Sequence, residues 1–225
     1  MNSFLARLLA AAGLSLSVLP LQAAVSTFDA GAEGWTAQGD VEGTIEWSAT
    51  GGNPGGHVVI DDRAIGGVTY FVAPGAFLGN QSGALGTSLT FDLMQVYPGS
   101  PNQFDSPDVV LQGGGLTLVY DTPVNPGNGA WTSYSVLFDV PGRAPGWRLD
   151  SGALATYGQL ATVMSGLTAL RIRAEYQTGA DVGRLDNVVL VPEPGTWSML
   201  AVGLSGVVVA RRWQSTRQRA ARDEA

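Results

Sequence analysis

The sequence predicts an all-β fold, an antiparallel sandwich or barrel, because short apolar runs alternate with clusters of turn-forming residues. Two runs show the strand period most clearly. In 88–94 the residues Leu89, Phe91 and Leu93 fall on one face, and 169–176 repeats this alternation with Leu170 and Ile172. Strong turn signals separate the runs, including GGNPGG at 51–56 and NPGNG at 125–129.

The predicted strands follow one another along the central part of the chain. In order they are 25–28, 44–48, 57–61, 68–72, 88–94, 116–120, 133–138, 169–176 and 185–191. Helical signals are few. Residues 74–80 are compatible with one turn that begins at Pro74, and 156–167 predicts one short helix because Leu160, Val163 and Met164 recur at helical spacing.

Composition limits the classes of function. The segment 24–191 has the length of one domain and holds sixteen Asp and Glu against six Arg, and the protein contains no Lys. Nucleic acid is therefore not an expected partner, since phosphate binding needs a basic surface. The absence of Cys excludes disulfides and thiol chemistry, and a triad of the Ser-His-Asp type would have to use His57, the only histidine.

The N-terminal residues predict a secretory signal peptide over 1–23. Arg7 precedes an uncharged apolar run over 8–21, Pro20 breaks it, and the small residues Ala23 and Ala24 follow, so we expect cleavage after one of these two. The alternative, a retained membrane anchor, would need a longer apolar run and a different flank.

The C-terminal residues predict a second membrane element over 192–225. Pro192, Glu193 and Pro194 require an extended backbone, and 195–210 then has no ionisable side chain. Sixteen helical residues at about 1.5 Å each span about 24 Å, somewhat less than a hydrocarbon core of about 30 Å. The arginines that begin at Arg211 and Arg212 predict a cytoplasmic tail, which places the domain on the outer side of the membrane.

Pro-Glu-Pro, a short apolar helix and an arginine cluster, in this order at the end of a chain, resemble the PEP-CTERM sorting signal of Gram-negative bacteria. The resemblance implies recognition by an exosortase-type processing enzyme, transient residence in the inner membrane and delivery to the cell surface or exopolysaccharide matrix. An ordinary single-pass anchor is the alternative interpretation.

The central segment also resembles a known domain. The phrases FDAGAEGW (28–35), EWSATGGNPGGHVVIDD (46–62), TYFVAPGAFLGN (69–80), PDVVLQGGGLTLVYD (107–121) and GRLDNVVL (183–190) are similar in order and character to the laminin IV type A domain, or laminin B. This resemblance covers nearly all of 26–190. It implies a jelly-roll β-sandwich like those of galactose-binding and carbohydrate-binding modules, and it implies no catalytic activity.

A structural calcium ion is the one cofactor that the resemblance suggests. In jelly-roll binding modules, carboxylates near the paired first and last strands commonly hold Ca²⁺, which takes six to eight oxygen ligands. Asp29, Glu33 and Asp186 are the candidate ligands. The alternative is that Asp186 and Asn187 accept hydrogen bonds from nearby backbone amides at a turn.

The remaining candidates each have a structural and a functional interpretation. Trp35, Trp47 and Trp147 either pack in the core or offer a stacking surface to a sugar, with the core preferred. Asp61 and Asp62 are adjacent in a strand and point to opposite faces, so they do not form a paired-acid catalytic site. A solvated turn with Arg63 is expected instead.

Arg171 and Arg173 share one face of a strand. We expect this face to be solvated, with a contact patch for an anion or a sugar as the alternative.

The sequence therefore predicts an exported, non-enzymatic binding or structural protein, whose most plausible ligand is a polysaccharide. Sugar binding follows here from fold analogy alone. Two alternatives remain: a glycan-active hydrolase that uses two carboxylates, and a purely structural matrix protein without a specific ligand.

Overall fold

The computed structural model of the protein describes residues 23–39, 45–99, 105–139 and 146–191. The predicted signal peptide, the Pro-Glu-Pro motif, the apolar helix and the arginine tail lie outside these residues. No helix within the described ranges is both long and apolar enough to cross a membrane.

The described chain is built almost entirely from β-strands. The strands are β1 (Ala24–Ser26), β2 (Thr36–Gln38), β3 (Glu46–Gly52), β4 (Gly55–Asp62), β5 (Tyr70–Val72), β6 (Ser88–Val96), β7 (Val109–Gly113), β8 (Leu116–Tyr120), β9 (Thr132–Leu137), β10 (Arg148–Leu149), β11 (Leu167–Arg173) and β12 (Asp181–Leu190). Two short 3₁₀ turns, Gly75–Phe77 and Ser82–Ala84, and one helix, α1 (Tyr157–Ser165), complete the described elements.

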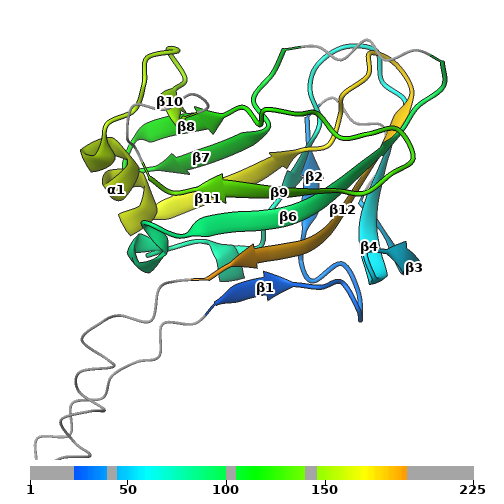
Figure 1. Ribbon diagram of the computed structural model, residues 1–225, viewed down its shortest axis with the longest axis horizontal. Coiled ribbons are helices and arrows are strands. Elements are labelled where there is room, and N and C mark those ends of the chain that lie inside the picture. Colours follow the sequence, from blue (N-terminus) through cyan, green and yellow to red (C-terminus); the bar gives the residue numbers. More distant parts are fainter. Residues whose placement is uncertain (1–22, 40–44, 100–104, 140–145, 192–225) are drawn as a thin grey trace, which may run out of the picture. The chain divides into compact units, whose positions relative to one another are not determined.

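The strands form two antiparallel sheets that face each other (Figure 1). In the first sheet the order is β3-β4-β12-β6-β9, and β1 also pairs with β12; in the second it is β10-β8-β7-β11-β5-β2. The chain crosses between the sheets repeatedly, as the path of a jelly roll requires. The predicted all-β sandwich is therefore confirmed, including the pairing of the first and last strands.

The core lies between the sheets and follows the alternation of the strands. Leu89, Phe91 and Leu93 of β6 are buried on its inner face, and Leu170 and Ile172 of β11 are buried opposite them in the other sheet. Aromatic and aliphatic side chains from both sheets fill the space between, which is the arrangement that stabilises a sandwich.

The β3–β4 hairpin approaches the neighbouring strand β12 closely. Its tip is Asn53-Pro54, a cis peptide bond, and Gly51 and Gly55 on either side have positive φ angles. A Cβ atom on Gly52 would lie 2.6 Å from Asp186 Oδ2 and 2.3 Å from the carbonyl oxygen of Gly56, so only glycine fits there. The GGNPGG segment thus brings a backbone turn against β12.

Helix α1 agrees with the predicted helix in place and in buried face. Thr156 caps it: the backbone N–H of Gln159 donates to Thr156 Oγ1, and the Thr156 N–H donates to Gln159 Oε1 at 2.8 Å. Leu160, Val163 and Met164 are buried, and the helix packs at the ends of β7 and β8 (Figure 1).

Candidate functional site

Asp186, the predicted calcium ligand on β12, lies in a buried polar network. Its Oδ2 accepts a hydrogen bond of 2.6 Å from the Asn53 N–H at the hairpin tip, and its Oδ1 accepts one of 2.7 Å from the Asn187 N–H. A register shift follows Asp186 in the pairing with β6, and Asn187 has a positive φ of 51°. The predicted alternative holds for the Asn187 N–H, but Asp186 lies inside β12 and not at a turn, and its other donor comes from the distant hairpin.

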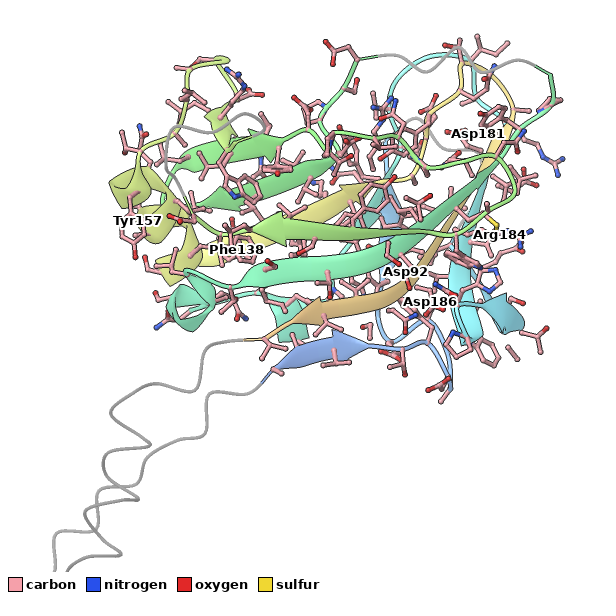
Figure 2. The ribbon with its side chains drawn as sticks, viewed as in Figure 1. Asp92, Phe138, Tyr157, Asp181, Arg184 and Asp186 are labelled. Atoms are coloured by element: carbon pink, nitrogen blue, oxygen red, sulfur yellow. The ribbon has the colours of Figure 1, made fainter. Side chains whose placement is uncertain are left out.

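A second carboxylate stands beside Asp186. Asp92 of β6 is its direct partner in the sheet, and Figure 2 shows the two side chains on neighbouring strands. The side-chain amides of Asn53 and Asn187 both donate to Asp92 Oδ2, at 3.2 and 2.9 Å. Burial raises the pKa of Asp186, and the charges of Asp92 and Asp29 raise it further.

The other two predicted calcium ligands are engaged elsewhere. Glu33 Oε1 accepts a hydrogen bond of 2.7 Å from the Phe28 N–H, and Asp29 Oδ2 accepts one of 2.9 Å from the Thr27 hydroxyl. In the described part of the chain, no group of three or more acidic or histidine side chains is placed to hold a metal ion. Calcium binding by Asp29, Glu33 and Asp186 stays a prediction, and it would require these contacts to rearrange.

Of the three tryptophans considered as sugar-stacking candidates, two belong to the core. Trp35 is buried and its indole N–H donates to Ser26 Oγ at 2.9 Å, while Trp147 is buried against Phe138 and donates to the Leu137 carbonyl at 2.9 Å. They offer no ring face to a sugar. Trp47 on the edge strand β3 differs: it is 41% exposed, although its N–H donates to the Phe28 carbonyl.

The side chains of Asp61 and Asp62 point to opposite faces of β4, as strand alternation predicts, but Asp62 is not solvated. Asp61 is partly exposed and forms an ion pair of 2.7 Å with Arg63. Asp62 points inward and is buried; its Oδ2 accepts from the Thr69 hydroxyl at 2.7 Å. The expectation of a solvated turn is therefore wrong for Asp62, because its side chain lies on the inner face of β4.

Asp62 belongs to an acid cluster, which we define as Asp62, Glu175 and Asp181. All three are buried. Thr69 links two of them, since its N–H donates to Glu175 Oε2 at 3.0 Å while its hydroxyl donates to Asp62. Asp181 is the direct strand partner of Asp62. Asp62 lies more than a hundred residues before Glu175 and Asp181, so no local motif marks the whole cluster.

Burial is the largest cause of the raised pKa values in the acid cluster. It raises the pKa of Glu175 to about 7, and the neighbouring charges of Asp62 and Asp181 raise it as well. Burial likewise raises the pKa of Asp181 to about 7, with a further contribution from Asp62. Asp181 Oδ2 accepts from the Tyr176 N–H at 3.1 Å, but Oδ1 is buried and has no hydrogen-bond partner among the described residues. A buried acceptor in this state typically costs about 1–3 kcal/mol.

Arg173 departs from the predicted solvated face. It is only 2% exposed; its Nη1 donates to the Ser106 carbonyl at 2.9 Å, and its guanidinium lies 3.5 Å from Asp108 and 4.2 Å from the Tyr176 ring centroid. The segment that leads into β7 covers this end of β11, which strand alternation alone does not reveal. Arg171 on the same face stays partly exposed and donates to Gln112 Oε1 at 2.9 Å.

His57 does not have the surroundings of a catalytic base. It is buried, and its ring packs edge-on against Trp131 with 5.6 Å between centroids. Burial and the nearby Arg184 charge lower its pKa, so the neutral imidazole is favoured. This agrees with a structural histidine in strand β4.

Two hollows on the surface are lined by described residues. One hollow, of about 260 Å³, has only polar residues on its walls, including Asp105, Asp108, Asp121, Thr122, Asn125 and Arg173. The other, of about 380 Å³, combines apolar and acidic walls and includes Asp61, Val96, Tyr97, Pro98, Asp181 and Val182. We call the second one the strand-end hollow. Apolar walls with a few convergent polar groups are typical of small-ligand sites.

The laminin B (domain IV) family matches residues 70–192, more than half of the chain. This chain belongs to the laminin B family. The predicted laminin IV relationship is thereby confirmed, and the matched range contains β5 to β12, including most of the residues of both hollows.

Individual laminins agree with the family assignment. Laminin subunit gamma-1 of Xenopus tropicalis is 30% identical over 183 residues, which cover 74% of this chain and 10% of that protein. Human laminin subunit gamma-2 is 35% identical over 128 residues, which cover 54% of this chain and again 10% of the relative. The chain therefore spans about a tenth of the length of these relatives.

A solved laminin domain has the same fold. The L4b domain of human laminin alpha-2 aligns with a TM-score of 0.56 at 14% sequence identity, covering 74% of this chain and 95% of that domain. At this identity the likeness concerns the fold alone, and it agrees with a sandwich of two antiparallel sheets.

Proposed function

We propose that this protein is an exported, non-enzymatic binding or structural protein of the cell surface or exopolysaccharide matrix. The observation that supports this most is membership of the laminin B family over the larger part of the sandwich. An acidic domain without cysteine or lysine agrees with a role outside the cell that involves neither nucleic acid nor thiol chemistry.

Polysaccharide is the ligand class that we assign to it. The strand-end hollow combines apolar and carboxylate walls, which suit the C–H faces and the hydroxyl groups of a sugar. The hydrolase alternative needs two carboxyls that reach one substrate. Asp61 and Asp62 point to opposite faces, and the acid cluster is buried, so neither pair supports that alternative. A matrix protein without a specific ligand remains the second candidate, since family membership alone is compatible with it.

The route to the cell surface is the second part of the proposal. A signal peptide over 1–23 starts export, and the segment 192–225 directs exosortase-type processing at Pro192, Glu193 and Pro194, with Arg211 and Arg212 holding the tail on the cytoplasmic side. Intact-mass analysis of the surface-associated protein tests this route. We expect a polypeptide that lacks both ends, whereas a mature protein that still ends at 225 would argue against processing.

A glycan array probed with the purified protein tests the ligand class, with reducing ends measured after prolonged incubation. Binding without new reducing ends is the expected result. New reducing ends would favour the hydrolase, and the absence of any binding would favour the purely structural protein.

A further inference from the structure

Trp131, which directly precedes β9, lies on the outer face of the first sheet. Its ring packs edge-on against His57 of β4, with 5.6 Å between the ring centroids. Val58 and Ile60 of β4 are buried in the core, so strand alternation points His57 outward, yet it is only 2% exposed. An outward side chain is buried only when another group covers it, and Trp131 is in position to provide that cover.

The indole of Trp131 is fixed in place and remains open to solvent. Its N–H donates to the Gly51 carbonyl at 3.2 Å, which ties the ring to the β3–β4 hairpin. Trp131 is partly exposed. Because His57 lies beneath the ring, the exposed part of the ring is on the side away from the sheet. A fixed indole in this position offers an apolar surface and loses little conformational entropy when a ligand stacks on it.

Arg184 of β12 brings hydrogen-bond donors to the same place. It points outward because Leu185 beside it is buried in the core. Burial and the Arg184 charge lower the pKa of His57, which places the guanidinium near the imidazole. The Arg184 side chain is partly exposed, and its Nε has no hydrogen-bond partner among the described residues. We call Trp131 and Arg184 together the Trp131 platform.

The Trp131 platform lies on the same face of the sheet as the strand-end hollow. Val182, which lines the hollow, and Arg184 alternate along β12 with the buried Asp181 and Leu185. Figure 2 shows Arg184 between Asp181 and Asp186. At about 3.3 Å per residue, Val182 and Arg184 are about 7 Å apart along the strand. One oligosaccharide that runs along β12 can therefore contact both the hollow and the platform.

We propose that the Trp131 platform is a second contact for the polysaccharide, where one neutral sugar ring stacks its C–H face on the indole and its hydroxyl oxygens accept hydrogen bonds from the Arg184 guanidinium. This proposal rests on the polysaccharide binding proposed above and adds a contact to it. The paired Asp92 and Asp186 lie on the same face, so an anionic sugar would be repelled there.

Isothermal titration with neutral gluco-, xylo- and galacto-oligosaccharides of four to six units tests the platform. Trp131→Ala removes the ring, and we expect affinity to fall about tenfold. Trp131→Tyr keeps an aromatic ring for stacking and should stay within about threefold of the wild type. Arg184→Gln removes the guanidinium and should weaken binding about fivefold.

Two matched variants serve as controls. Trp47→Ala removes an indole that is 41% exposed on the edge strand β3, and Arg171→Gln removes a partly exposed arginine from the outer face of the second sheet. Both should leave affinity within about twofold. Urea unfolding of each variant separates a loss of binding from a loss of folding, and Arg184→Gln tests the platform without removing any core side chain.

The outcomes separate the platform from the broader function. If the wild-type protein binds an oligosaccharide and Trp131→Ala and Arg184→Gln bind it equally well, the platform is wrong and polysaccharide binding stands. A loss in Trp131→Tyr or in Trp47→Ala as large as that in Trp131→Ala would also overturn the platform. If the wild-type protein binds none of these sugars, the platform falls together with neutral polysaccharide binding.

Discussion

The acid cluster makes the stability of the sandwich depend on pH, because Glu175 and Asp181 have folded-state pKa values of about 7. Both values lie above those of the unfolded chain, so the folded protein binds more protons between about pH 4 and pH 7. The stabilisation is complete below the unfolded pKa and is lost as pH rises through 7. One pKa unit corresponds to about 1.4 kcal/mol, so two units between pH 5 and pH 7 give at most about 2.7 kcal/mol per carboxyl.

The two carboxyls do not contribute independently, since ionising one disfavours ionisation of the other. We therefore expect Glu175 to account for about 2 kcal/mol of the loss between pH 5 and pH 8. The assay is urea unfolding of the wild-type protein and of Glu175→Gln at both values. The amide keeps an acceptor for the Thr69 N–H, and it removes the charge.

The change in unfolding free energy between the two pH values is compared between variant and wild type, because His57 affects the pH dependence of both in the opposite direction. Its lowered pKa means that stability from the neutral ring is lost as pH falls below its ordinary value. Between pH 5 and pH 8 the free energy of unfolding of Glu175→Gln should rise by about 2 kcal/mol relative to that of the wild type. Asp61→Asn, at a partly exposed neighbour, is the control and should show no such gain. Parallel pH dependence in wild type and Glu175→Gln would refute the reasoning.

Further predictions concern the core, the calcium site and the buried arginine. Trp147→Ala should lower the free energy of unfolding by about 3–5 kcal/mol in a denaturant titration, whereas Trp47→Ala on the exposed edge should cost about 1 kcal/mol. If the predicted ligands bind Ca²⁺, calcium chloride should raise the melting temperature relative to EDTA, and Asp186→Asn should remove the difference; an unchanged melting temperature would end the calcium prediction. Arg173→Met should destabilise the protein by about 3–5 kcal/mol in the same titration, because it leaves Asp108 buried without its partner charge; a loss below about 1 kcal/mol would contradict this.

Strand alternation made most of the fold predictable from the sequence. The strands 88–94, 116–120 and 133–138 were placed within two residues of β6, β8 and β9, and 156–167 contains α1. The prediction missed β2, β7 and β10. Two of these are only two or three residues long, and β7 is buried at four of its five positions, so it shows no alternation.

The buried polar groups were not predictable in the same way. Alternation places Arg173 on the outer face of β11, but whether that face is covered depends on the distant segment around Ser106. Asp62, Glu175 and Asp181 look like ordinary surface acids in the sequence, and Asp62 meets the other two only when β4 pairs with β12. Long-range strand pairing therefore decides which charged side chains are buried, and the local sequence pattern does not predict this.

The central claim is that this sandwich binds a polysaccharide without altering it, at the strand-end hollow. Two-dimensional ¹H–¹⁵N spectra of the protein, recorded during titration with the best-binding oligosaccharide, test this most directly. We predict shift changes concentrated at 96–98 and 180–182, with the signals of the sugar unchanged after prolonged incubation. Shift changes centred on another face, or cleavage of the oligosaccharide, would contradict the account.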